Sequence, residues 1–491
     1  MPYLMMKTIT LCARDLIQIS QSVDHQVSAE AVPLQFGQAC LIYIKLALPA
    51  VGGMLLMRGP EVVDYVVAGH LGDPAFVAGF GLALVSMSVM VVSLSIGLSG
   101  GVETLCSQAF GRNEDAQAGE YYRRAQLIMT ALFIPQAILL CFAPELLIMT
   151  GQPEKASYLA GDYIKICMPG IWCYCQTELL RRFLGAQGVF KIIMNFQILN
   201  FFLHFLWIYI FVYTLDLSYS GIAYATLMTY MLNYICPVLY ISLFSTNVRA
   251  DSWGCISRST FSGLLQYLEY GLPSMTMNVA EVWAFEVVVI MGGYFGEENL
   301  AAFVTTFNVM ITLYMVALGF QFSANTVVGN CLGAGQAQKA KMFVNVTLAT
   351  AVLLCVGHAI VVLTCKDYIA AMLVTGDGLR KKCSKMLALF VFLGFGKYIQ
   401  AISQGVIKAM GFQKYATVIC LVGYWIVSLP ITYFFSFHLG YGVEALCICC
   451  SIGMIFAGIC STILIYRTDL DKLCKDIDLV MKRESKNQAT S

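Results

Sequence analysis

The sequence predicts an all-α, polytopic membrane protein of twelve transmembrane helices in two pseudo-symmetric six-helix lobes. Composition is the first reason: of 491 residues, 59% are hydrophobic and only 12% are charged, and the mean hydropathy is +0.74. A soluble domain carries about 25% charged residues. Apolar runs of the ~20 residues needed to cross the hydrocarbon core recur from near Gln38 to near Tyr466. The bilayer is therefore the expected solvent, and a net charge of +1 gives no indication of nucleic-acid binding.

Lys and Arg residues gather in alternate loops, as Arg112, Arg181 and Lys339 do. Short cytoplasmic loops retain positive charge, so we expect both termini to be cytosolic. The predicted parts are a cytosolic leader (1–37), an N-lobe with spans 1–6 (38–245), a cytosolic linker (246–262), a C-lobe with spans 7–12 (263–466) and a cytosolic tail (467–491).

An internal repeat supports the two-lobe architecture. A shift of 224 positions places Gly69 on Gly293 and Gly111 on Gly335, and a shift of 223 places Gly188 on Gly411. Many transporters consist of two similar bundles around a central site. Because six spans is an even number, both halves should insert in the same orientation, with a cleft between them.

Five short motifs resemble signatures of the multidrug and toxin extrusion (MATE) transporters, particularly the eukaryotic type. The resemblance covers nearly the whole chain and implies a MATE-like fold of the MOP superfamily. It also implies a secondary active antiporter that exports small organic solutes (drugs, toxins or metabolites) in exchange for H⁺ or Na⁺ by alternating access. The motifs are GHLG at 69–72, ETLCSQAFG at 103–111, LGAQ at 184–187, EVWAFE at 281–286 and GNCLGAG at 329–335.

Two carboxylates in the predicted seventh span are the leading candidates for ion coupling. Glu281 falls near the middle of the bilayer and Glu286 nearer its outer side. A charge at this depth costs at least ~2.5 to 3.5 kcal/mol. Burial favours the protonated form of a carboxyl group and a bound cation favours the ionised form, so protons and cations can compete for one carboxylate. The same residues could instead only stabilise helix packing.

Lys397 is a departure from the family pattern, because eukaryotic relatives carry an acidic residue at the matching place in span ten. Counting along that span puts Lys397 near the depth of Glu281, in the same lobe. Lys397 could extend toward the membrane surface or lie in a polar cavity, and the alternative is an ion pair between Lys397 and Glu281. Such a pair would weaken attraction for a cation and makes anionic or zwitterionic solutes reasonable substrates.

In the N-lobe, Asp64 lies in a VDYVVAG segment that resembles the VDxxxAG motif of prokaryotic relatives, whose aspartate belongs to a cation site. Asn200 and His204 are four residues apart, so they share one helical face, at positions where those relatives have polar site residues. His204 replaces the usual asparagine. Since imidazole titrates near neutral pH, this replacement favours proton coupling over sodium coupling. Arg58 and Glu61, three residues apart, should pair locally.

Trp283, Asn308 and Tyr314 occupy positions that the family uses to line the C-lobe cavity. Aromatic faces there could hold flat or cationic groups, although aromatic residues in spans often serve packing alone. The lining candidates are thus Lys397, Asn308, Tyr314 and Trp283.

Other functional classes fit less well. The chain has no zinc-protease motif, P-loop or catalytic aspartate pair, so we expect no enzyme activity, cofactor or metal site. The main alternative is a flippase of lipid-linked intermediates, which would normally need a more basic cavity. The predicted partners are a small organic solute, H⁺ or Na⁺ and the lipid bilayer, around a monomeric protein. The predicted location is the plasma membrane or a vacuolar or other internal membrane.

Overall fold

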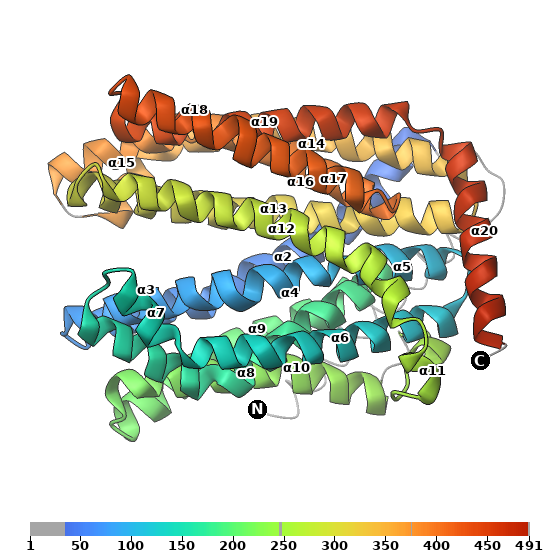
Figure 1. Cartoon of the computed structure of the whole chain (residues 1–491), viewed down its shortest axis with the longest axis horizontal. Coiled ribbons are helices and arrows are strands. Elements are labelled where there is room, and N and C mark those ends of the chain that lie inside the picture. Colours follow the sequence, from blue (N-terminus) through green and yellow to red (C-terminus); the bar gives the residue numbers. More distant parts are fainter. Residues whose placement is uncertain (1–34, 245–247, 375, 490–491) are drawn as a thin grey trace, which may run out of the picture.

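The computed structural model describes residues 35–244, 248–374 and 376–489. All but the last three residues of the predicted leader, 1–37, lie outside this part of the chain. The described residues form two groups of roughly parallel helices, an N-lobe and a C-lobe, with their long axes along one direction (Figure 1). The all-α prediction is confirmed.

The N-lobe begins with a long helix, α2, which contains Pro49 and Pro60. Asp73 caps the next helix: its carboxylate accepts a hydrogen bond from the Ala75 amide at 2.9 Å, and Pro74 supplies a first-turn residue that needs no hydrogen bond. The N-lobe helices are α2 (Phe36–His70), α3 (Pro74–Met87), α4 (Ser93–Leu98), α5 (Gly100–Gly111), α6 (Asp115–Cys141), α7 (Ala143–Met149), α8 (Glu154–Ala186), α9 (Phe190–Ile208) and α10 (Ser218–Phe244), with π-helical segments η1 (Ser88–Val92) and η2 (Tyr209–Thr214).

A short linker with η3 (Ala250–Ser252) and α11 (Arg258–Phe261) leads to the C-lobe. Gly263, at φ +86°, makes the left-handed turn that starts α12. The remaining elements are α12 (Leu264–Gly293), α13 (Glu297–Gly333), α14 (Ala337–Leu373), α15 (Asp377–Leu389), α16 (Val391–Ala409), α17 (Gln413–Leu421), η4 (Val422–Ser428), α18 (Leu429–Tyr433), η5 (Phe434–His438), α19 (Gly442–Arg467) and α20 (Leu470–Ala489).

Ten helical stretches in the described chain are long and apolar enough to cross a membrane, and α15 with α16, bent by 41°, adds an eleventh. The predicted count of twelve is thus not confirmed. The missing candidate is α8, which has 33 residues but is less apolar than the others. The reason is visible at its C-terminal end, where Glu178, Arg181 and Arg182 are buried inside the protein.

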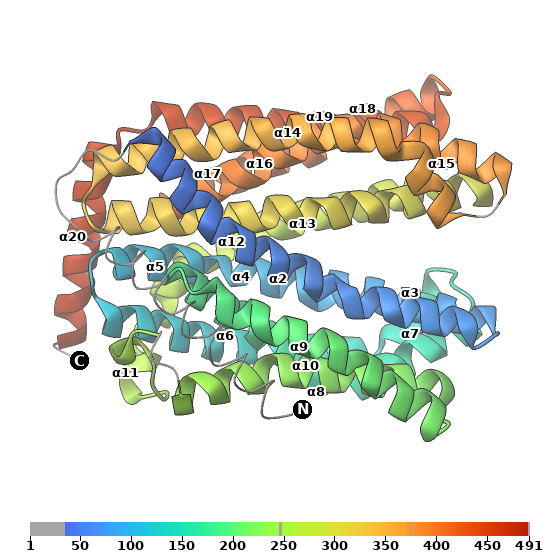
Figure 2. The same ribbon diagram turned by 180° about the vertical axis from the view of Figure 1, so that it is seen from behind.

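The helix α20 crosses one end of both lobes (Figure 1), and we call this the α20 end. Leu473, Ile477 and Met481 of α20 are buried against the bundle, and Asp478 pairs with Arg112 of the N-lobe. Seen from behind, α2 begins near the α20 end and then runs diagonally along α13 of the other lobe (Figure 2). The Tyr43 hydroxyl donates to the Phe320 carbonyl at 2.9 Å at this crossing. The lobes are therefore joined mainly on the side of α20.

Candidate functional site

The C-lobe contains a buried ion pair between Glu281 of α12 and Lys397 of α16. Their side chains are 12% and 8% exposed. The side-chain amide of Gln400, one turn along α16, donates to the other carboxylate oxygen of Glu281 at 3.0 Å, and the Tyr424 hydroxyl donates to the side-chain amide oxygen of Gln400 at 2.6 Å. The expectation that Glu281 and Lys397 meet is therefore confirmed, and a network from three helical stretches holds the carboxylate.

Aromatic rings surround the ammonium group of Lys397. Its Nζ lies 4.3 Å from the centre of the Tyr314 ring and 5.5 Å from the centre of the Phe285 ring. Both distances fall within the range of cation–π attraction. Tyr314 was a predicted lining residue, and the structure places it against Lys397.

Three other predicted C-lobe residues lie apart from this network. Glu286 is half-buried and forms no ion pair among the described residues. Trp283 is 41% exposed. The Asn308 side chain is exposed and donates to the Val304 carbonyl of its own helix at 3.0 Å. Only Glu281, Lys397 and Tyr314 of the C-lobe candidates are thus brought together.

The N-lobe contains a second buried cluster, built around Asp64 of α2, which is 1% exposed. One carboxylate oxygen lies 3.0 Å from Nε2 of His204, and the other accepts a hydrogen bond from the Thr226 hydroxyl at 2.7 Å. The Tyr163 hydroxyl donates to Thr226 at 2.9 Å, and Nδ1 of His204 lies 2.8 Å from the Thr229 hydroxyl. Asp64 is therefore shielded from solvent rather than solvated near the outer interface.

The contact between Asp64 and His204 needs a proton between its two atoms, because neither a carboxylate oxygen nor a bare ring nitrogen can donate. Tyr163, Thr226 and Thr229 extend this contact at both ends into a continuous series of groups that can exchange protons. Asn200, predicted on the same face as His204, instead donates to the Asn233 side chain at 2.8 Å. Arg58 and Glu61 form the predicted local ion pair.

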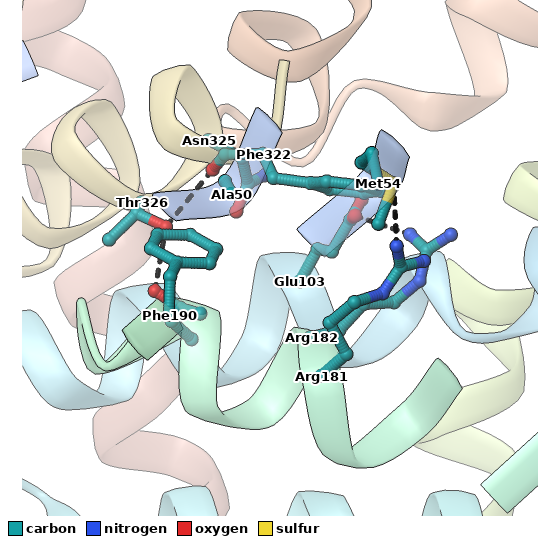
Figure 3. A pocket seen from close by; sticks show the side chains of 11 residues that line it. Ala50, Met54, Glu103, Arg181, Arg182, Phe190, Phe322, Asn325 and Thr326 are labelled. Atoms are coloured by element: carbon teal, nitrogen blue, oxygen red, sulfur yellow. Dashed lines mark hydrogen bonds and ion pairs between the residues drawn. The ribbon is translucent and has the colours of Figure 1, made fainter. Parts of the chain in front are cut away.

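A third charged group was not predicted as a site. Glu103 of α5 is paired with Arg182 of α8, and Lys408 of α16 lies 3.2 Å from its second carboxylate oxygen. Figure 3 shows Glu103 and Arg182 beside Arg181, where they line a small cavity together with Phe322 and Asn325. The sequence showed Glu103 only as part of the ETLCSQAFG motif. Its depth in an apolar segment was the signal that could have identified it.

Partners such as Thr226, Tyr163, Gln400 and Tyr424 were also missed. The apolar spans contain many hydroxyl and amide groups, and the sequence does not show which of them turn toward a buried charge. Each lobe thus holds at least one acidic side chain away from water, Asp64 in the N-lobe and Glu281 in the C-lobe, with polar groups arranged around it. Such a group can take up and release a cation or exchange its partner for a charged solute.

Comparison with known proteins agrees with this architecture. Residues 49–210 and 273–434, one segment in each lobe, match the MatE family model. The chain is 29% identical over 451 residues to multidrug and toxin extrusion protein 1 of Danio rerio, covering 91% of this chain and 75% of that protein. It is 27% identical over 433 residues to protein DETOXIFICATION 17 of Arabidopsis thaliana, covering 88% and 90%. The crystal structure of the eukaryotic MATE transporter AtDTX14 superposes with a TM-score of 0.81 at 23% identity, covering 89% of this chain and 99% of that one.

Proposed function

The chain belongs to the MatE family of transporters, and on that premise we propose that it exports small organic solutes across a membrane in exchange for protons. The two lobes alternate between access to one face and to the other. Relatives named for multidrug and toxin extrusion support the general activity. The roles that we assign to the lobes, solute binding in the C-lobe and proton coupling in the N-lobe, rest on their buried acidic groups.

The observation that carries the proposal is the pairing of Glu281 with Lys397. A free buried carboxylate would attract an organic cation, but here its charge is already balanced by an ammonium group. An anionic or zwitterionic solute can instead bind through its own carboxylate to Lys397, with its apolar or cationic part against Tyr314. We therefore propose that this pair forms the solute site and that the solute is an organic anion or zwitterion.

The cluster around Asp64 supports protons as the driving ion. Sodium requires several oxygen ligands with room for a cation, whereas both oxygens of this carboxylate already meet a partner, one of them a ring nitrogen. A neutral imidazole can donate a proton from one ring nitrogen and accept one at the other. Protonation of the pair formed by Asp64 and His204 is therefore the proposed coupling step.

The orientation follows from the charges at the two ends of the bundle. Arg112, Arg249 and Lys408 lie toward the α20 end, and Lys155 and Lys382 toward the opposite end. We propose that the α20 end is cytosolic, as the positive-inside rule favours. Both termini are then cytosolic, and the protein acts as a monomer in the plasma membrane or a vacuolar or other internal membrane.

The test is solute flux into reconstituted vesicles under separately imposed proton and sodium gradients. Anionic, zwitterionic and cationic fluorescent solutes are compared for the parent and for Lys397→Met. We expect the parent to move anions or zwitterions under a proton gradient and the variant to lose that preference. A parent driven only by sodium contradicts the coupling proposal, and a variant with unchanged solute preference contradicts the solute site.

A further inference from the structure

The contact between the lobes at the α20 end repeats itself in the two halves of the chain. The Thr104 hydroxyl of the N-lobe donates to the Lys408 carbonyl at 2.8 Å, and the Thr326 hydroxyl of the C-lobe donates to the Gly185 carbonyl at 2.8 Å. The two donors are 222 positions apart and the two acceptors 223. These bonds are therefore equivalent contacts in the two repeats.

A second pair of hydrogen bonds follows the same rule. The Gln108 amide donates to the Ala409 carbonyl at 2.8 Å, and the Asn330 amide donates to the Ala186 carbonyl at 3.3 Å. Side chains of one lobe thus cap carbonyl groups at the helix ends of the other, where α8 and α16 leave carbonyls without helical partners.

Glycines allow the two backbones to come this close. A Cβ atom on Gly111 would lie 2.2 Å from the Asn330 carbonyl oxygen, and one on Gly333 would lie 2.0 Å from the Gln108 carbonyl oxygen. Both glycines face the backbone of the opposite lobe and end equivalent helices, again 222 positions apart. The shift of 224 that placed Gly111 on Gly335 is therefore wrong by two positions at these helix ends. The seam of hydrogen bonds and glycines therefore closes the α20 end with pseudo-two-fold symmetry.

The charged groups break this symmetry. By the same shifts of 222 and 223 positions, Glu103 corresponds to Asn325 in the second repeat, and Arg182 corresponds to Gly405. Within the seam, Glu103 pairs with Arg182 of its own lobe, while the Lys408 ammonium reaches it from the other lobe at 3.2 Å. Thus one carboxylate, 3% exposed, connects the two lobes by charge.

The contact between Glu103 and Lys408 depends on whether the α20 end is closed. Separating a buried carboxylate from one of its cations leaves both charges short of a partner, which is strongly destabilising unless water enters. When the lobes part at this end, water can reach Lys408, while Glu103 keeps Arg182. The contact between Glu103 and Lys408 is therefore stable in the closed state and lost in the open one.

We propose that Glu103 and Lys408 are gating residues that hold the α20 end of the transport route closed, with the glycine and amide seam as the surface that separates. Arg182 positions Glu103 for this contact. The inference rests on the proposed alternating access but not on the identity of the solute or the driving ion.

The experiment measures the separation of the lobes directly, in detergent or nanodiscs without any solute or gradient. Ala116, at the start of α6, and Gln338, at the start of α14, are both exposed at the α20 end. Each is replaced by a keto-bearing amino acid for spin labelling, because 19 native cysteines rule out thiol labels. Pulsed electron paramagnetic resonance then gives the distance distribution between the two labels.

We expect one dominant short distance in the parent. Glu103→Gln and Lys408→Met should each raise the population at longer distance by about 5- to 150-fold, the usual range for coupling between two states. Lys408→Arg retains the charge and should keep most of the short-distance population. If Glu103→Gln does not yield folded protein, the comparison of Lys408→Arg with Lys408→Met still tests the proposed gating contact.

Glu298→Gln is the matched control, because it removes a carboxylate from an exposed ion pair within the C-lobe, with Lys382 at 2.8 Å. Its distance distribution should equal that of the parent. Unchanged distributions in both Glu103→Gln and Lys408→Met overturn the gate. If the distances shift but no solute is transported in vesicles, the gate stands and the proposed function fails.

Discussion

The two lobes share a backbone plan but hold their buried acidic groups in opposite ways. In the N-lobe, Asp64 meets the ring of His204 and the hydroxyl of Thr226. In the C-lobe, Glu281 meets the ammonium group of Lys397. The two nitrogens of an imidazole can donate or accept a hydrogen bond, whereas an ammonium group can only donate.

This difference shows that two lobes with the same backbone plan can surround their buried carboxylates with different chemical groups. A ring nitrogen that can either donate or accept suits the gain and loss of a proton, and an ammonium group that donates to a carboxylate suits the binding of an anionic group. We therefore expect changes in the two lobes to have different effects, in the C-lobe on stability and solute preference and in the N-lobe on coupling to protons.

The largest effect should follow from breaking the C-lobe pair. Glu281→Gln or Lys397→Met alone leaves one buried charge without its partner, which costs about 3–5 kcal/mol. The double variant Glu281→Gln/Lys397→Met removes both charges and should recover most of that loss. Denaturant unfolding of the purified protein in detergent measures the three free energies. If the loss of unfolding free energy in the double variant equals the sum of the two single losses, Glu281 and Lys397 are not energetically coupled.

The seam between the lobes is where the two halves should respond alike. Gly111→Ala and Gly333→Ala each push a methyl group into the opposite backbone, and overpacking of this kind costs about 1–3 kcal/mol. Gly293→Ala is the control, because its added Cβ would meet nothing within 4 Å. Thermal unfolding should show similar losses for the first two and little change for the third. A large difference between Gly111→Ala and Gly333→Ala would contradict equivalent packing.

In the N-lobe, His204→Asn retains a polar side chain but removes the ring whose two nitrogens contact Asp64 and Thr229. Loss of a hydrogen bond to a charged group corresponds to about 1.5–3 kcal/mol, so uptake driven by a proton gradient should fall at least about tenfold. His358→Asn is the matched control, since this buried C-lobe histidine has no hydrogen-bond partner among the described residues. Vesicle flux at a fixed proton gradient measures both variants. An equal loss of solute flux in His204→Asn and His358→Asn would contradict a specific role of His204 in proton coupling.

The smallest effect should come from an exposed ion pair at the end opposite α20. The Lys155 ammonium, 2.6 Å away, and the Ala75 amide donate hydrogen bonds to Asp73 and lower the pKa of its carboxyl group. Because this pKa is lower in the folded state, the stabilisation is present above the ordinary aspartate pKa of about 3.9. It disappears as the pH falls through the lowered value.

Lys155→Met should therefore lower the unfolding temperature slightly at neutral pH and not at all once Asp73 is protonated. Unfolding temperatures of parent and variant across the acidic range measure this difference. A difference in unfolding temperature between parent and variant that increases as the pH falls would contradict the assigned ion pair between Lys155 and Asp73.

Much of the C-lobe site could be predicted from the sequence. Glu281 and Lys397 stand out because a charge deep in an apolar span is costly and needs a partner, and counting residues along two spans gave them similar depths. The local pair of Arg58 and Glu61 follows from helix geometry alone. In each case the position of a residue along its own helix was enough to make the prediction.

The other residues of the two sites could not be predicted, because their contacts depend on how the helices are rotated and packed. Gln400, Thr226 and Tyr163 are ordinary polar residues until a neighbouring helix turns a carboxylate toward them. The number of spans also remained open, because the polar residues of α8 are hidden inside the protein and lower its apolar character without exposing it to water.

By itself, the sequence determined that this chain folds as membrane helices in two repeats and that charges are buried in each half, because apolar length and the cost of a charge in lipid are properties of local segments. Only the tertiary structure decided that His204 and Thr226 meet Asp64 and that the seam at the α20 end is crossed by Glu103 and Lys408. Partners that lie some 300 positions apart in the chain meet only when helices pack, and packing depends on the whole set of contacting surfaces rather than on any one segment.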